Sequence, residues 1–266
     1  MSVHMRNLGL PVLLAACVAV GVTGCAGPTG GTPGPILPSA TGATVMPSAG
    51  PTDATTSPST PTPTSTTATG CAPNGASIPA GADTATIEDV DGDGKPDVEY
   101  YSESPTFEYG IQTASGATIS LADDLAGPGR HGGWSALLEN ETVITVLDDG
   151  RTATLHAFVD CGFVTTKGVD GNPYRFLLNG FGETGTGVEC SDGNGGRQLI
   201  GVLAARDSSG NYGIVNTVVT VSGDGLLATN GTSSTVATGL PESDPQVVAA
   251  MGSSCGDIPK VQTSGM

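Results

Sequence analysis

The chain has 266 residues, of which 26 are acidic and nine are basic, so its formal net charge is −17. This balance argues against binding to nucleic acid, because contact with phosphates requires a basic face, and it favours divalent cations or basic partners. Aromatic residues make up only 4% of the chain, while Gly contributes 41 residues. That composition favours short strands and turns over a helical bundle.

The N-terminus has the form of an export signal. Arg6 precedes an apolar run over residues 8–22, which is shorter than the roughly 20 residues of a membrane-spanning helix and is typical of a signal-peptide core. The run ends in Val22-Thr23-Gly24-Cys25, which resembles a bacterial lipobox. That resemblance implies removal of residues 1–24, acylation of Cys25, and a lipid anchor on the extracytoplasmic face of the cell membrane. The alternative is an ordinary secretory signal.

Residues 25–70 are predicted to form a disordered linker. All but five of residues 26–70 are Pro, Thr, Ser, Gly or Ala, and Asp53 is their only charged residue. Without apolar periodicity, this segment has no core to offset the entropy lost on ordering. Its Pro-Thr alternation at residues 58–64 favours extended conformations. An anchor followed by such a linker would hold a folded domain away from the membrane.

Residues 71–266 are predicted to form one all-β domain. Residues 143–147 and 152–158 flank a turn at residues 148–151, which is a hairpin signal. Turn dipeptides such as Asp170-Gly171 separate further strand-like runs. These runs lie at residues 84–87, 98–101, 107–112, 117–121, 174–178, 198–204 and 212–221. Many short strands at this spacing favour a sandwich, a barrel or a propeller.

One short helix is predicted near the C-terminus, at residues 244–251. Ser243 or Asp244 can cap its N-terminus, because a short polar side chain can accept a hydrogen bond from the first free backbone N–H groups. Pro245 suits the first turn, and Gly252 can end the helix.

The strongest motif in the domain is an acidic loop, Asp89-Val90-Asp91-Gly92-Asp93-Gly94-Lys95-Pro96-Asp97. Its carboxylates stand at loop positions 1, 3, 5 and 9, and a Gly at position 6 permits a sharp turn around one point. Four carboxylates this close repel one another without a cation or protons. We therefore expect Ca²⁺, held by Asp89, Asp91, Asp93, Asp97 and the backbone carbonyl of Lys95 at position 7. The alternative is a solvated acidic turn without an ion.

The acidic loop departs from the EF-hand pattern. That pattern needs an acidic ligand at position 12, which here is Tyr100, and the residues after Pro96 favour a strand. With strand-like runs before and after the loop, residues 84–101 resemble an FG-GAP or VCBS repeat. The resemblance implies the calcium-bearing blades of integrin-α-type β-propellers. In its abundance of Ala, Gly, Thr and Pro, the chain also resembles actinobacterial lipoproteins.

Two weaker copies of the loop are compatible with a repeat protein. Residues 190–199 align with residues 89–98, and Asp192 and Asn194 match two of the four acids. Because the charge is lower there, we expect a relic of the shape and not a second strong metal site. A third copy is placed at residues 134–146. Since a domain of 196 residues fits only about four blades of four strands, the expectation is a small propeller-like or repeat-derived antiparallel β domain.

The cysteines indicate an oxidising compartment. Cys17 lies within the predicted signal peptide and Cys25 is the predicted lipid site, which leaves Cys71, Cys161, Cys190 and Cys255 in the domain. An even number of cysteines in an exported domain implies two disulfides, with three ways of pairing them. We expect the pairs Cys161–Cys190 and Cys71–Cys255, the second of which would join the two ends of the domain.

Two classes of function are compatible with these features. The first is a lipid-anchored, calcium-binding module without catalytic residues, which serves binding or structural interactions with an envelope protein or glycan. The alternative is an extracytoplasmic enzyme acting on envelope carbohydrate, since paired carboxylates can serve a glycosidase. Calcium explains the clustered acids better. Two acids roughly 5–10 Å apart in a cleft without an ion would favour the enzyme.

Overall fold

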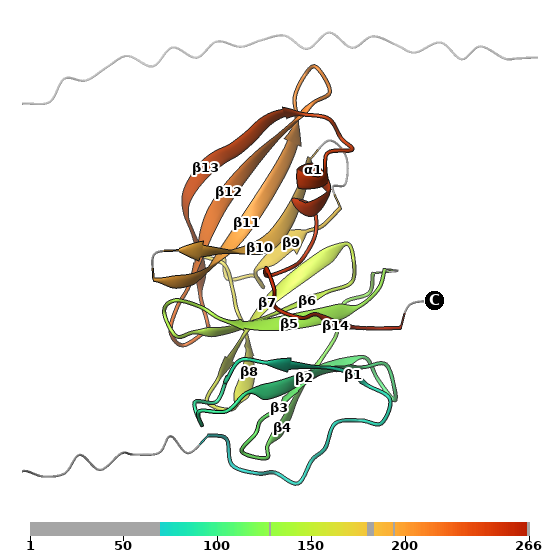
Figure 1. The fold of residues 1–266 in the computed structure, drawn as a ribbon, viewed down its shortest axis with the longest axis vertical. Coiled ribbons are helices and arrows are strands. Elements are labelled where there is room, and N and C mark those ends of the chain that lie inside the picture. Colours follow the sequence, from blue (N-terminus) through green and yellow to red (C-terminus); the bar gives the residue numbers. More distant parts are fainter. Residues whose placement is uncertain (1–69, 128, 180–183, 194, 265–266) are drawn as a thin grey trace, which may run out of the picture. The chain divides into compact units, whose positions relative to one another are not determined.

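The computed structural model describes residues 70–127, 129–179, 184–193 and 195–264. The predicted signal peptide, the predicted lipid site Cys25 and the predicted linker up to residue 69 lie outside the described residues. The described residues belong to one unit of the chain, Thr62–Met266. They form three antiparallel sheets and one short helix (Figure 1), which confirms the prediction of an all-β domain.

The first sheet is a four-stranded meander in which each strand pairs with the next. Its strands are β1 (Asp83–Ile87), β2 (Asp97–Ser102), β3 (Glu108–Gln112) and β4 (Thr118–Ala122). All four lie where alternating and β-branched residues predicted strands. The acidic loop is the connection from β1 to β2.

The central sheet contains six strands. They are β5 (Gly132–Leu137), β6 (Val143–Asp148), β7 (Thr152–Val159), β8 (Gly162–Thr165), β9 (Arg175–Leu177) and β14 (Val261–Gln262). The strands β14-β5-β6-β7-β8 follow one another across the sheet, and β9 pairs with β7. The predicted hairpin is β6–β7. The third loop copy, expected at residues 134–146, falls on the β5–β6 hairpin and stays a prediction.

The sequence predicted no strand for β5, because Gly132-Gly133 interrupts the apolar pattern there. In the structure, neighbouring side chains come so close to the backbone here that a residue with a side chain would not fit. A Cβ atom on Gly133 would lie 2.6 Å from Leu147 Cδ2 and 2.9 Å from Tyr109 Cδ2. The strand is therefore permitted by the absence of a side chain at this position.

The third sheet is a second four-stranded meander. Its strands are β10 (Thr184–Gly193), β11 (Gly196–Arg206), β12 (Tyr212–Val221) and β13 (Ala228–Leu240). Residues 190–199, where the sequence predicted a relic of the loop shape and no second strong metal site, belong to the paired strands β10 and β11, with Asp192 opposite Arg197. Strand pairing up to the Gly193–Gly196 pair leaves no room for a metal-binding loop.

The helix α1 (Pro245–Ala249) confirms the predicted C-terminal helix. Asp244 caps it, since its side chain accepts a hydrogen bond of 2.9 Å from the backbone N–H of Gln246. Val247 is buried on the third sheet against residues such as Val202 and Ile214. Among the described residues, no helix is long and apolar enough to cross a membrane.

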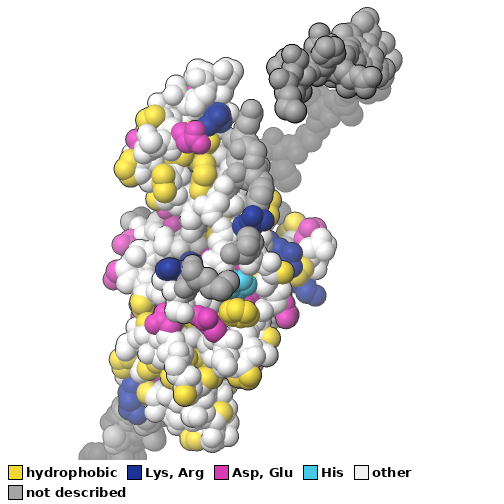
Figure 2. Space-filling view, turned by 90° about the vertical axis from the view of Figure 1, so that its right-hand side faces the viewer, with side chains coloured by type: hydrophobic (Ala, Val, Ile, Leu, Met, Phe, Trp, Pro, Cys, Tyr) yellow, Lys and Arg dark blue, Asp and Glu magenta, His cyan; other side chains and the backbone are white. Residues whose placement is uncertain are grey.

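Separate apolar cores join the sheets. One contains Ile111 and Tyr109 of the first sheet together with Leu147 and Phe158 of the central sheet. Another joins the central sheet to the third through a larger set of buried side chains, among them Trp134, Ile144, Leu155, Phe176, Leu199 and Val219. The three sheets of the described residues do not close into a ring, so the fold is not a closed propeller. On the face shown in Figure 2, charged side chains are scattered among neutral ones.

The four cysteines of the domain form two disulfides, as predicted, but the predicted pairing is wrong. The bonds are Cys71–Cys161, with Cα atoms 5.6 Å apart, and Cys190–Cys255, with Cα atoms 4.6 Å apart. A parallel bridge between Val188 and Ser253 brings Cys190 to Cys255. The two ends of the domain are not joined by a disulfide, because Cys71 bonds to Cys161 and Cys255 bonds to Cys190.

Candidate metal centre

The acidic loop is folded by hydrogen bonds from its own backbone. The Asp89 carboxylate accepts hydrogen bonds of 2.7 Å from the backbone N–H groups of both Gly92 and Gly94. These glycines have φ angles of 76° and 86°, in the left-handed region that side chains other than Gly rarely adopt. The turn that the sequence predicted at Gly94 is therefore present, together with a second one at Gly92.

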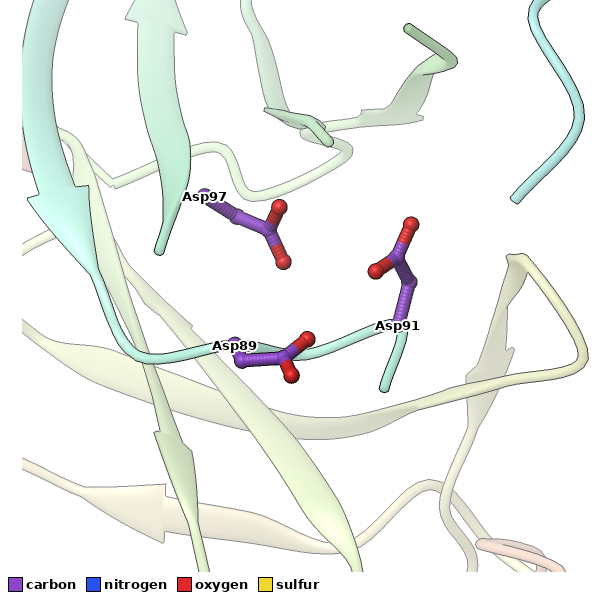
Figure 3. Close-up of side chains that lie close together, drawn as sticks. All are labelled: Asp89, Asp91 and Asp97. Carbon is purple, nitrogen blue, oxygen red and sulfur yellow. The ribbon is translucent and has the colours of Figure 1, made fainter. Parts of the chain in front are cut away.

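Three of the loop carboxylates converge on one point. Asp89, Asp91 and Asp97 each offer one oxygen, and these oxygens all lie within 4.8 Å of one another. Figure 3 shows the three carboxyl groups around a shared space. Asp97 is fully buried, whereas Asp89 and Asp91 are partly exposed. Carboxylate oxygens are the hard ligands that Ca²⁺ and Mg²⁺ prefer.

The Asp93 carboxylate lies outside this group. Asp93 Oδ1 accepts a hydrogen bond of 2.8 Å from the backbone N–H of Lys95, and its Oδ2 lies 3.6 Å from Lys95 Nζ. The Lys95 side chain is largely exposed, so this ion pair contributes little to stability. Of the four predicted carboxylates, the structure thus brings together Asp89, Asp91 and Asp97.

Burial and mutual repulsion act on the innermost acid. Burial raises the pKa of the Asp97 carboxyl, and it outweighs the hydrogen bonds from the backbone N–H groups of Val90 and Ala114. The negative charges of Asp91 and Asp89 raise this pKa further. Because each of these effects disfavours the ionised form, a cation between the three carboxylates would stabilise it.

Asp91 is held differently, by groups far away in the sequence. Burial raises the pKa of its carboxyl, but hydrogen bonds from Ser115 Oγ, at 2.6 Å, and from the backbone N–H of Cys71, at 2.8 Å, lower it below its ordinary value. Gly70 packs against the same carboxylate, since a Cβ atom there would lie 2.7 Å from Asp91 Oδ2. No spacing in the sequence indicated these contacts, because they join three separate segments.

Glu99, a buried acid of β2, lies outside the cluster and faces the central sheet. Glu99 is fully buried, and its Oε2 accepts hydrogen bonds from the Tyr109 hydroxyl, at 2.6 Å, and from the backbone N–H of Ser135, at 2.9 Å. Its Oε1 has no hydrogen-bond partner among the described residues. Burial raises the pKa of this carboxyl to about 8. Glu99 of β2 therefore links the first sheet to Ser135 of the central sheet, and its raised pKa favours the protonated carboxyl at neutral pH.

Comparisons with models of protein families, with curated protein sequences and with solved structures gave no match. The resemblance to FG-GAP and VCBS repeats therefore stays a prediction from the sequence. The geometry adds that the acidic loop joins the first two strands of a four-stranded antiparallel meander, which is the form that propeller blades take.

Proposed function

We propose that this protein is a calcium-stabilised β module, anchored to the extracytoplasmic face of the cell membrane through lipid on Cys25, that serves binding or structural interactions in the envelope. The observation that carries the proposal is the convergence of Asp89, Asp91 and Asp97 on one point. The two disulfides support an oxidising compartment outside the cytoplasm.

The three carboxylates fit a calcium ion. Two oxygens that each lie about 2.4 Å from one ion are at most about 4.8 Å apart, and the three oxygens of the cluster satisfy this limit. Each carboxylate already accepts hydrogen bonds from the protein, but a carboxylate oxygen has a second lone pair that a cation can use. Since Ca²⁺ takes six to eight oxygens, water or backbone carbonyls would supply the others.

A bound ion would cross-link the acidic loop, the start of β2 and the segment at Cys71. Asp97 begins β2, and Asp91 holds the backbone N–H of Cys71. A cation held by both would add to the stability of the folded state and not of the unfolded chain, because the unfolded chain does not bring these carboxylates together.

Thermal unfolding in calcium and in chelator tests this proposal. Extracellular calcium modules bind with dissociation constants of roughly 10⁻⁴–10⁻³ M, and at a hundred times that constant the linkage is about 2.7 kcal/mol. For a domain of this size, we expect Tm to rise by roughly 5–10 °C. Magnesium should substitute poorly, because it demands a smaller and more rigid octahedron. A Tm that is the same in calcium and in chelator, at matched ionic strength, would reject the calcium site.

Membrane fractionation tests the anchor separately. A single acyl chain binds membranes only marginally, so stable attachment requires more than one chain on Cys25. We expect the wild-type protein in the membrane fraction and the Cys25→Ala variant in the soluble or secreted fraction. If the wild-type protein and the Cys25→Ala variant are found in the membrane fraction to the same extent, the lipoprotein interpretation is wrong.

We do not propose the alternative of an enzyme acting on carbohydrate. One pocket of about 430 Å³ is lined by two carboxylates, Asp83 and Glu103. Each accepts a hydrogen bond from the backbone of the C-terminal segment: Asp83 from the N–H of Gln262 and Glu103 from the N–H of Ser264. These bonds support a structural role for both acids in holding β14 and the residues after it.

A further inference from the structure

Two hollows adjoin each other where β9 meets the third sheet. The first has a volume of about 470 Å³ and the second a volume of about 220 Å³. They share Tyr174, Arg175 and Asn230 as lining residues, and we call the two together the β9 trench. The first hollow extends past Asp170 and Thr229, and the second extends along β11 and β12.

Two of the residues shared by both hollows, Tyr174 and Asn230, are held by contacts within the protein. The Tyr174 hydroxyl donates a hydrogen bond to Asn230 Oδ1, and the Tyr174 ring packs edge-on against Phe176, with the ring centroids 5.3 Å apart. The backbone of Tyr174 is bonded on both sides, to Thr166 and to Leu155. A ligand entering the trench would therefore meet groups that are already ordered, which lowers the entropic cost of binding.

The second hollow is lined in part by Gly201, which adds no side chain to it. Gly201 lines it, and a Cβ atom at this position would lie 3.4 Å from the Phe176 ring. Leu203 and Thr217 line the same hollow, and the Thr217 hydroxyl lies 2.8 Å from the hydroxyl of Ser233. The second hollow thus combines an apolar side chain with hydroxyl groups.

The trench is lined by one basic residue, Arg175, and one acidic residue, Asp170. Arg175 is exposed and forms no ion pair with the described residues, although acids outnumber bases 26 to nine in the chain. Asp170 lines the same hollow, and its carboxylate accepts hydrogen bonds from Asn172. The trench therefore offers one cationic donor, one anionic acceptor, and amide and hydroxyl groups beside an aromatic ring.

We propose that the β9 trench binds a neutral oligosaccharide, with consecutive sugar units in the two hollows. Sugars carry hydroxyl groups that both donate and accept hydrogen bonds, which matches Arg175, Asp170 and Asn230, and they have an apolar C–H face that can pack against Tyr174 and Leu203. A polyanion is disfavoured by Asp170 within the trench and by the net charge of −17. This site is separate from the acidic loop and does not depend on calcium.

Binding of defined tetrasaccharides to the full-length protein tests the proposal. The probes are neutral gluco-, manno-, galacto- and arabino-configured tetrasaccharides, with tetragalacturonic acid as the anionic comparison, titrated by calorimetry in calcium and in chelator. We expect at least one neutral probe to bind, with equal affinity in both buffers. Binding of the acidic probe alone, or of none, would overturn the proposal. The chelator comparison separates this result from the fate of the calcium site.

Variants locate the binding. Arg175→Gln should weaken binding of the neutral probe at least tenfold, because it removes the exposed guanidinium. Arg130→Gln is the matched control, since Arg130 is also exposed, forms no ion pair with the described residues and lies in another pocket. Asn230→Asp keeps an acceptor for Tyr174 but removes the amide donor, and it should weaken binding as well. If Arg175→Gln and Arg130→Gln both bind like wild type, the ligand does not occupy the β9 trench.

Discussion

The backbone N–H of Cys71 donates a hydrogen bond of 2.8 Å to Oδ2 of Asp91, across 20 residues of sequence. Ser115 Oγ completes the contact, because it lies 2.6 Å from the same carboxylate oxygen and 2.7 Å from the carbonyl oxygen of Cys71. The acidic loop, the start of the described chain and the β3–β4 turn are therefore fixed to one another. An ion bound by Asp91 would therefore help to hold together the acidic loop, the start of the described chain and the β3–β4 turn.

The acids of the loop are expected to contribute unequally to calcium binding. We expect Asp89→Asn to abolish most of the calcium-dependent rise in Tm, because Asp89 belongs to the converging group. Asp93→Asn should retain most of this rise, because the Asp93 carboxylate faces Lys95. Asp192→Asn, in the β10–β11 hairpin, is the control. Melting curves over a calcium titration measure all three variants, and an equal loss in Asp93→Asn would place Asp93 among the ligands.

Peptide mapping without reduction should recover the pairs Cys71–Cys161 and Cys190–Cys255 and no free thiol among these four. The bonds span sequence separations of 90 and 65 residues, for which the chain-entropy model gives a contribution of about 4–5 kcal/mol each. Reduction should therefore lower the free energy of unfolding by several kcal/mol in denaturant titrations. A recovered Cys71–Cys255 peptide would contradict the structure.

Glu99 should make the domain less stable as the pH rises. Its pKa is about 8 in the folded state against about 4.3 in an unfolded chain, so the folded state binds more protons between these values. The contribution of Glu99 is most favourable below about pH 4 and is lost as the pH rises through 8. Glu99→Gln should remove this dependence and be more stable than wild type at pH 8, on the order of 1–3 kcal/mol.

Urea unfolding between pH 5 and pH 9 measures this difference. The free energies of unfolding of wild type and Glu99→Gln should be closest at pH 5, and the difference between them should grow as the pH rises. Other acids titrate in both proteins, so the difference between them isolates Glu99. A constant difference across the range would show that the Glu99 carboxyl is ionised in the folded state throughout.

Gly110 is required by a ring on the neighbouring strand. It lies opposite Tyr100 in the β2–β3 pair, and a Cβ atom there would lie 2.3 Å from the Tyr100 ring. Gly110→Ala should therefore lower the free energy of unfolding by about 1–3 kcal/mol. Gly223→Ala is the control, since a Cβ atom at Gly223 meets nothing within 4 Å. Equal stability of the two variants in denaturant titrations would show that Tyr100 is free to move aside.

The sequence predicted those elements whose signals are local. Strands with alternating or β-branched residues, the β6–β7 hairpin, the capped helix and the turn at Gly94 of the acidic loop were all found where expected. By contrast, β5, β10 and β13 are rich in Gly, Ser and Thr, and their strand conformation depends on neighbours such as Tyr109 and β11. The disulfide pairing and the contacts of Asp91 depend on which distant segments meet, and no local spacing encodes that.

The Cys71–Cys161 bond determines how tension would pass through the molecule. A pull applied from the N-terminal side reaches Cys71 first, and the disulfide transfers it directly to Cys161, between β7 and β8 of the central sheet. Strands β1–β7 and the acidic loop lie between these cysteines in the sequence, so the intact bond keeps them out of the line of force. Reduction would place all of this intervening chain, which includes the whole first sheet and β5–β7 of the central sheet, in series with the load.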